Sequence, residues 1–152
     1  MNSEPPVGAI HPLEWENVST SLVITPTGNS PQHAAQLIFS KLEFSESVHA
    51  GVTAVTTDRS VSLTFDEKFS PDAEEQVLGL SRHLASKAAI IREFAHQGNL
   101  VGIEISGLVE TNAKLRLSPT AFAAISALGA SLTFRTLVPE ELQEDDPLAW
   151  LD

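Results

Sequence analysis

The segment 61–80, VSLTFDEKFSPDAEEQVLGL, places a strand directly before a helix. Apolar residues alternate with polar ones from Val61 to Phe65, which is the pattern of a strand with one buried face. Ser70-Pro71 then favours a helix start, because serine is a good N-cap and proline suits the first helical position. From Val77 onward apolar residues recur at helical spacing. This strand followed by a helix is the unit from which we predict the fold.

The same helix start occurs twice more. Ser30-Pro31 and Ser118-Pro119 each precede apolar residues at helical spacing. The middle helix keeps one apolar stripe as far as Gly98, a favourable residue for a helix end. A single helix from Ser70-Pro71 to Gly98 would be long for a small domain. We therefore expect a break or kink near Ser86. Three helical regions therefore divide the chain.

Strands are expected between and beside these helices. The alternating or apolar segments lie at 22–25, 48–55, 61–66, 101–105, 114–117 and 132–137. Segment 57–60 would form a turn, and 114–117 would pair back on 101–105. The order reads β-α-β-β-α-β-β-α-β. We therefore predict an α+β protein with a single, largely antiparallel sheet covered by helices.

The 152 residues are sufficient for one domain, and the charge is unevenly placed along them. We predict a peripheral N-terminal arm at 1–18, the α+β domain at 19–137 and an acidic C-terminal tail at 138–152. The tail holds six acidic residues and no base, whereas the whole chain has a net charge of −11. Most of the excess charge is therefore appended to a mildly acidic body.

The composition argues against several classes of protein. The chain has no cysteine, which excludes disulfide scaffolds and thiolate zinc sites. Its nine bases are spread singly, so the net field would repel nucleic acid and anionic lipid. The first residues do not have the basic and apolar pattern of a signal peptide, and the sequence contains no run of eighteen apolar residues. We expect a cytoplasmic protein that binds neither nucleic acid nor membrane, and its oligomeric state stays open.

The sequence has no motif for catalysis or for holding a cofactor. The five histidines form no metal-ligand spacing, and neither a serine elbow nor a glycine-rich phosphate loop occurs. Adjacent acids are more often solvated than catalytic. We predict no catalytic residue, no metal site and no cofactor.

A binding surface is better supported, because acidic residues stand beside aromatic ones. Tryptophan is a frequent interface anchor, and surrounding carboxylates attract a basic partner. Trp15 lies between Glu14 and Glu16, but for this residue we favour the alternative that it packs the N-terminal segment onto the domain. The tail candidates are Glu140, Glu141, Glu144, Asp145, Asp146 and Trp150. A second acidic group at the long helix start comprises Asp66, Glu67, Asp72, Glu74 and Glu75.

The segment from Leu63 to Leu137 also resembles a known family. The features that carry the resemblance are Phe69-Ser70-Pro71-Asp72, the IIREF segment at 90–94, Leu117-Ser118-Pro119 and the LGASLTF segment at 128–134. They resemble a bacterial family of small domains of unknown function whose genes often occur in polymorphic-toxin loci. The resemblance implies an immunity-type protein that covers the active site of a toxin. It implies no catalytic residues.

The sequence therefore leaves three functions open. The first is an acidic, immunity-like inhibitor, not an enzyme, that blocks a basic protein partner such as a toxin domain. The second is a small enzyme or small-molecule-binding domain whose site is assembled from scattered residues: Asp58, Asp66, His49 and Arg116. The third is a homo-oligomer joined along a sheet edge.

Overall fold

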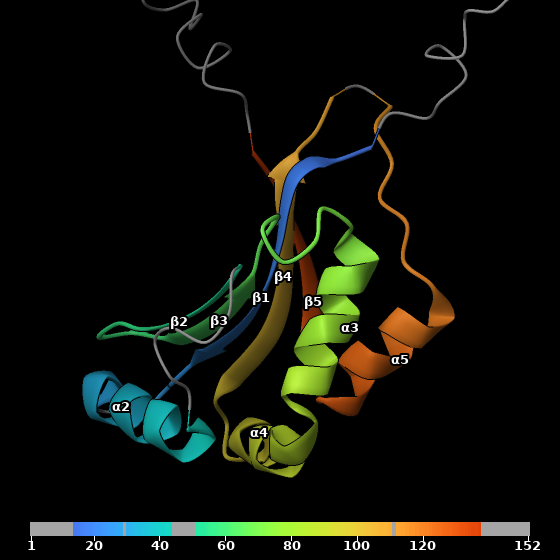
Figure 1. The fold of residues 1–152 in the computed structure, drawn as a ribbon. Helices are drawn as coiled ribbons and strands as arrows, with labels where there is room; N and C mark the ends of the chain where they lie inside the picture. The colour runs from blue at the N-terminus through green and yellow to red at the C-terminus, as the bar shows by residue number, and fades with distance from the viewer. Residues whose placement is uncertain (1–13, 29, 44–50, 111, 138–152) are drawn as a thin grey trace, which may run out of the picture.

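The computed structural model describes residues 14–28, 30–43, 51–110 and 112–137 (Figure 1). This part of the chain contains five strands, four α-helices and one 3₁₀ helix. In chain order they are β1 (Glu16–Thr25), α2 (Pro31–Leu42), β2 (Val52–Thr56), β3 (Val61–Phe65), α3 (Ala73–His83), η1 (Ala85–Lys87), α4 (Ala88–His96), β4 (Leu100–Leu108), α5 (Pro119–Ala127) and β5 (Ser131–Leu137).

The strands form one mixed sheet in the order β2-β3-β1-β4-β5. The first three neighbouring pairs are antiparallel, and β4 and β5 are parallel. The parallel pair follows from α5, because a helical crossover returns the chain to the same end of the sheet. The predicted α+β class is confirmed, with a sheet that is largely antiparallel.

One face of the sheet is apolar and the other is polar. Leu22, Leu63 and Ile103 lie opposite one another on three adjacent strands and are at most 1% exposed. The helices cover this face (Figure 1). The opposite face carries hydroxyl groups, which bond across strands between Ser19 and Ser106 at 3.0 Å and between Ser21 and Thr64 at 2.7 Å. The core therefore lies between the sheet and a single layer of helices.

Gln76 is a fully buried polar residue between α3 and β1. Its Nε2 atom donates to the carbonyl oxygens of Val18 and Ser70, both at 2.8 Å. Its Oε1 atom accepts from the hydroxyl of Thr20, the other fully buried polar side chain among the described residues, at 2.9 Å. Both amide hydrogens and the amide oxygen thus have partners. Because an unpaired polar group is costly in a core, these bonds fix α3 against the first strand.

The predicted break in the long helix is confirmed. Helix α3 ends at His83, and η1 redirects the chain before α4 begins. Lys87 lies at the end of η1, and its Nζ atom contacts Glu43 Oε1 at 2.8 Å. This hydrogen bond and the positive charge of Lys87 lower the pKa of the exposed Glu43 carboxyl. The pair joins the end of α2 to the turn between α3 and α4.

The start of α3 differs from the prediction. The N-cap is Asp72 and not Ser70, since Asp72 Oδ1 accepts from the amide of Glu74 at 3.1 Å. The Ser70 hydroxyl instead accepts from the amide of Asp72 at 3.2 Å. A turn through Asp66 precedes the helix, because the Asp66 carbonyl accepts from the amides of Phe69 and Ser70. Two good capping residues compete here, and the local turn selects the second.

The strand predictions need two corrections. Strand β1 starts at Glu16, so residues 16–18, predicted to end the N-terminal arm, belong to the sheet. Segment 114–117 is not a strand of this sheet, and Lys114 forms only an isolated bridge with Glu14. Part of the predicted strand 48–55 lies outside the described residues, and β2 forms its second half. The other predicted strands are confirmed.

None of the described helices has the length and apolar character needed to cross a membrane. The longest, α2, has 12 residues, whereas a span requires about 20 apolar ones.

We expect Gln76→Leu to lower the free energy of unfolding by about 2 to 4 kcal/mol, because it leaves two carbonyls and the Thr20 hydroxyl without their partner. Chemical denaturation of the variant measures this loss. Gln36→Leu, on the exposed side of α2, is the control and should change stability by less than about 0.5 kcal/mol. Similar stabilities for the two variants would contradict the role given to Gln76.

Candidate functional site

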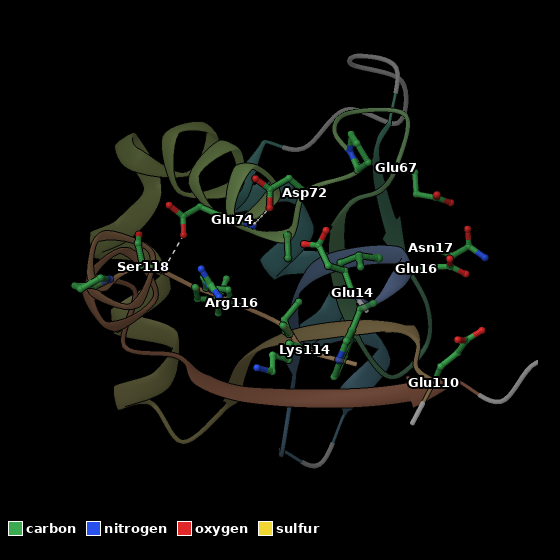
Figure 2. Close-up of a pocket in the computed structure, with 17 residues that line it drawn as sticks. Glu14, Glu16, Asn17, Glu67, Asp72, Glu74, Glu110, Lys114, Arg116 and Ser118 are labelled. Carbon is green, nitrogen blue, oxygen red and sulfur yellow. Dashed lines mark hydrogen bonds between the residues drawn. The ribbon is translucent and has the colours of Figure 1, made fainter. Parts of the chain in front are cut away.

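A cleft opens where the start of β1, the start of α3 and the segment before α5 come together (Figure 2). Its volume is about 1240 Å³. The lining residues are Glu14, Trp15, Glu16, Asn17, Val18, Glu67, Pro71, Asp72, Ala73, Glu74, Glu110, Lys114, Leu115, Arg116, Leu117, Ser118 and Pro119. Three stretches that are far apart in sequence thus build one site.

The cleft is strongly acidic. Six carboxylates and two cationic side chains line it, so acids exceed bases by four. Figure 2 shows Glu74 near Ser118 on one side, Glu16 and Glu67 on the other, and Glu14 between them. A cleft lined mainly by one sign of charge focuses the field and concentrates counter-ions of opposite sign. Cationic groups are therefore its natural ligands.

Three of the carboxylates have structural partners. Asp72 caps α3, and Glu74 Oε1 accepts from the backbone amide of Ser118 at 2.6 Å. Glu67 accepts at 3.0 and 3.1 Å from the Asn17 side chain, when the amide nitrogen of Asn17 is turned toward it. The Glu74 bond connects the first turn of α3 to the start of α5, and the Glu67 bond connects the turn after β3 to β1, so together they hold the walls of the cleft.

Asn17 lies at an irregularity in the sheet. The register between β1 and β4 shifts between Glu16 and Ser19, and Asn17 has a φ of +53°. Asparagine is one of the few residues other than glycine that adopt this conformation. A bulge bends a strand and redirects its side chains. In this protein the bulge lies where the start of β1 enters the wall of the cleft.

Trp15 packs onto the sheet and also lines the cleft. Its ring meets the exposed ring of Phe134 edge to face, with centroids 6.0 Å apart. Gly107 lies below it, since a Cβ atom there would stand 3.2 Å from Trp15 Cε3 and 3.1 Å from the Glu16 carbonyl oxygen. Of the two roles considered for Trp15, packing of the N-terminal segment onto the domain is therefore found.

The segment before α5 supplies the basic side chains of the cleft. Lys114 and Arg116 are exposed and alternate with Leu115 and Leu117, which pack against the core. This alternation is typical of a strand. The segment instead runs along the cleft, and Figure 2 shows both cationic side chains within it. The two bases thus lie among the six acids and leave the site negative.

The carboxylates are spread along the cleft and do not converge. No group of three histidine or carboxylate side chains in the described part of the chain could hold a metal ion. A distributed set of carboxylates is suited to several cationic groups that lie a few ångströms apart, such as arginine and lysine side chains on a protein surface.

Comparison with known proteins adds no relationship. No protein family, curated protein or solved structure matches this chain. The case for a site therefore comes from the geometry and charge of the cleft alone.

The structure gathers part of the predicted second acidic group. Glu67, Asp72 and Glu74 line the cleft, whereas Asp66 and Glu75 do not. Asp66 instead organises the turn before α3, and its Oδ1 atom accepts from the amide of Lys68 at 2.9 Å. The predicted tail residues, Glu140, Glu141, Glu144, Asp145, Asp146 and Trp150, lie outside the described residues.

The scattered residues of the alternative site are not brought together. Asp58 lines a separate hollow of about 490 Å³ beside the start of α2, Arg116 lines the acidic cleft, and Asp66 lines neither. His49 lies outside the described residues. The convergence that this alternative requires is therefore absent among its three described members.

Four charged lining residues were not among the predicted site residues: Glu14, Glu16, Glu110 and Lys114. The first two stand out in the sequence only as neighbours of Trp15. No sequence signal connects Glu110 or Lys114 with Glu67, because the connection depends on how β1 and the segment before α5 meet at one end of the sheet.

We expect Glu74→Ala to lower the free energy of unfolding by about 1 to 2 kcal/mol, because the amide of Ser118 loses a charged acceptor. Thermal or chemical denaturation checks this. Glu75→Ala is the matched control, since Glu75 is exposed in the same first turn of α3. If both variants lose the same free energy of unfolding, the loss comes from the interaction of each carboxylate with the helix dipole and not from the bond between Glu74 and Ser118.

Proposed function

We propose that this protein is an acidic, immunity-like binding protein that blocks a basic protein partner, such as a toxin domain, through the acidic cleft. The observation that carries the proposal is the excess of four carboxylates in a cleft of about 1240 Å³. The family resemblance of segment 63–137 points to the same class of protein.

The charge of the cleft selects the kind of partner. A phosphate backbone would be repelled, and a cationic protein surface would be attracted. Glu14, Glu16 and Glu110 are exposed carboxylates that line it. In this proposal they speed encounter with the partner, because oppositely charged patches steer association. The better-anchored Glu67 and Glu74 then face the docked cationic side chains.

Blocking in this proposal requires no chemistry. A partner that cleaves or modifies a polyanion needs a basic site, and a carboxylate-lined surface laid over that site occupies it both sterically and electrostatically. A protein–protein interface of standard size buries roughly 1,600 Å². The cleft would then form only the centre of the contact, with neighbouring surface around it.

An arginine-rich peptide tests the cleft before the partner is identified. In an NMR titration at low salt, we expect the largest amide shifts at 14–17, 67, 72–74 and 114–118. The double variant Glu14→Gln/Glu16→Gln should weaken peptide binding several-fold, because it removes two charges from the cleft. Added salt should weaken binding by the wild-type protein.

The matched control is Asp58→Asn/Glu93→Gln, which removes the same charge from exposed positions outside the cleft. It should leave peptide affinity nearly unchanged. If both double variants weaken binding equally, overall charge explains the binding and the cleft does not. Amide shifts that avoid the cleft would contradict the proposal directly.

The inhibitory role needs the natural partner. We expect purification from the native host to recover a basic protein whose activity is lost in the complex, with an association rate that falls steeply as salt rises. Neutralising the tail should slow association several-fold; the residues changed are Glu140, Glu141, Glu144, Asp145 and Asp146. An unchanged rate at low salt would remove the tail from the proposal, and a partner that stays active in the complex would refute inhibition.

A further inference from the structure

Strand β5 is an edge of the sheet and is unusually open. It is the last strand in the order β2-β3-β1-β4-β5, and six of its seven residues are exposed. Phe134 is 48% and Leu137 38% exposed. The other edge, β2, is shorter and buries Val52 and Ala54. An open edge strand offers unpaired backbone groups to another strand.

We propose that β5 pairs antiparallel with β5 of a second copy, which joins the two sheets into one across a two-fold axis at Phe134. This inference is independent of the proposed function. A pair of identical strands about a two-fold axis closes on itself, whereas β5 against β2 of another copy would propagate without end. The occupant is therefore a second copy of this chain.

The sequence of β5 is self-complementary in this register. Phe134 lies opposite its own copy, Leu132 opposite Thr136, and Ser131 opposite Leu137. Residues that face each other across an antiparallel pair share a face of the sheet. Because Trp15 already meets Phe134 edge to face, the two copies would bring four aromatic rings together on the helix-covered face. This contact would remove the exposed Phe134 from water.

The charges on the polar face are also complementary. Arg135 is the only charged residue of β5, and its NH1 atom lies 3.8 Å from Glu104 Oε1 of β4. Across the two-fold axis Arg135 would lie opposite Thr133 of the second copy, and Thr133 is the register neighbour of Glu104. Because the Thr133 side chain is short, Arg135 of one copy can reach over it to Glu104 of the other. Each Glu104 would then lie between two arginines.

The antiparallel arrangement also separates the points at which the two acidic tails begin. The tail continues the chain after Leu137, and the two copies of Leu137 would lie at opposite ends of the paired strands. Six residues of strand separate them by about 20 Å, more than twice the Debye length of about 8 Å at physiological salt. A parallel pairing would instead bring the two starting points of the tails side by side.

Sedimentation equilibrium of the full chain, from micromolar to millimolar concentration, tests the proposal. We expect a reversible dimer. Phe134→Lys should weaken it at least about tenfold, because two like charges would meet at the axis. Leu37→Lys is the control, because Leu37 is an exposed residue of α2, far from β5 in the sheet order. It should leave dimerisation unchanged. Hydrogen exchange of the β5 amides should quicken on dilution.

A second pair of variants tests the same pairing if Phe134→Lys does not fold. Arg135→Glu should also weaken the dimer, and adding Glu104→Arg should restore it. A monomer at every concentration overturns the proposal, and protected β5 amides in that monomer would indicate that another segment of the same chain covers the edge. A dimer that survives both Phe134→Lys and Arg135→Glu also overturns it, because another surface must then join the copies.

Discussion

The amide of Gln76 is the point on which the arrangement of this molecule depends. It joins α3 to β1 through the carbonyl of Val18 and the hydroxyl of Thr20, both in the buried interior, and to the turn before α3 through the half-buried carbonyl of Ser70. Without it, α3 would rest on β1 through apolar contacts alone, which permit sliding because the hydrophobic effect has no direction. Directional bonds set both the height and the rotation of the helix. That placement carries Asp72 and Glu74, at the start of the same helix, to the wall of the cleft.

The same network shows where sequence patterns succeed and where they fail. In strand β3 apolar residues alternate with polar ones, and in residues 101–106 of β4 they alternate with glycine or polar ones, and both strands were predicted. The first half of β1 was missed because Thr20 takes a core position, and a buried threonine interrupts the alternation unless its partner Gln76 is known. Segment 114–117 shows the reverse error, since its alternation reflects packing of Leu115 and Leu117 beside a cleft and not pairing in a sheet.

The site was predictable only in part for a similar reason. A cluster of acids within ten residues, such as Glu67, Asp72 and Glu74, is visible in the sequence. Glu14 and Glu110 join that cluster only because the start of β1 and the chain beyond β4 meet at one end of the sheet. Of the three serines predicted to cap helices, only Ser118 does so, on α5, whereas the Ser30 side chain makes no capping hydrogen bond to α2. The choice of Asp72 over Ser70 depends on the turn through Asp66, which no local pattern of residues indicates.

The position of β1 has a consequence for how the chain folds during synthesis. This strand is the first of the described strands in the sequence, yet it lies in the middle of the sheet, between β3 and β4. Among the strand pairs that the structure describes, only the β2–β3 hairpin joins neighbours in sequence through a short turn. The first strand must wait for residues 61–65 on one side and 100–108 on the other, and such distant pairings slow folding. A nascent chain that ends before β4 therefore leaves one edge of β1 without its partner, and this central strand is enclosed only after residue 108 has been made.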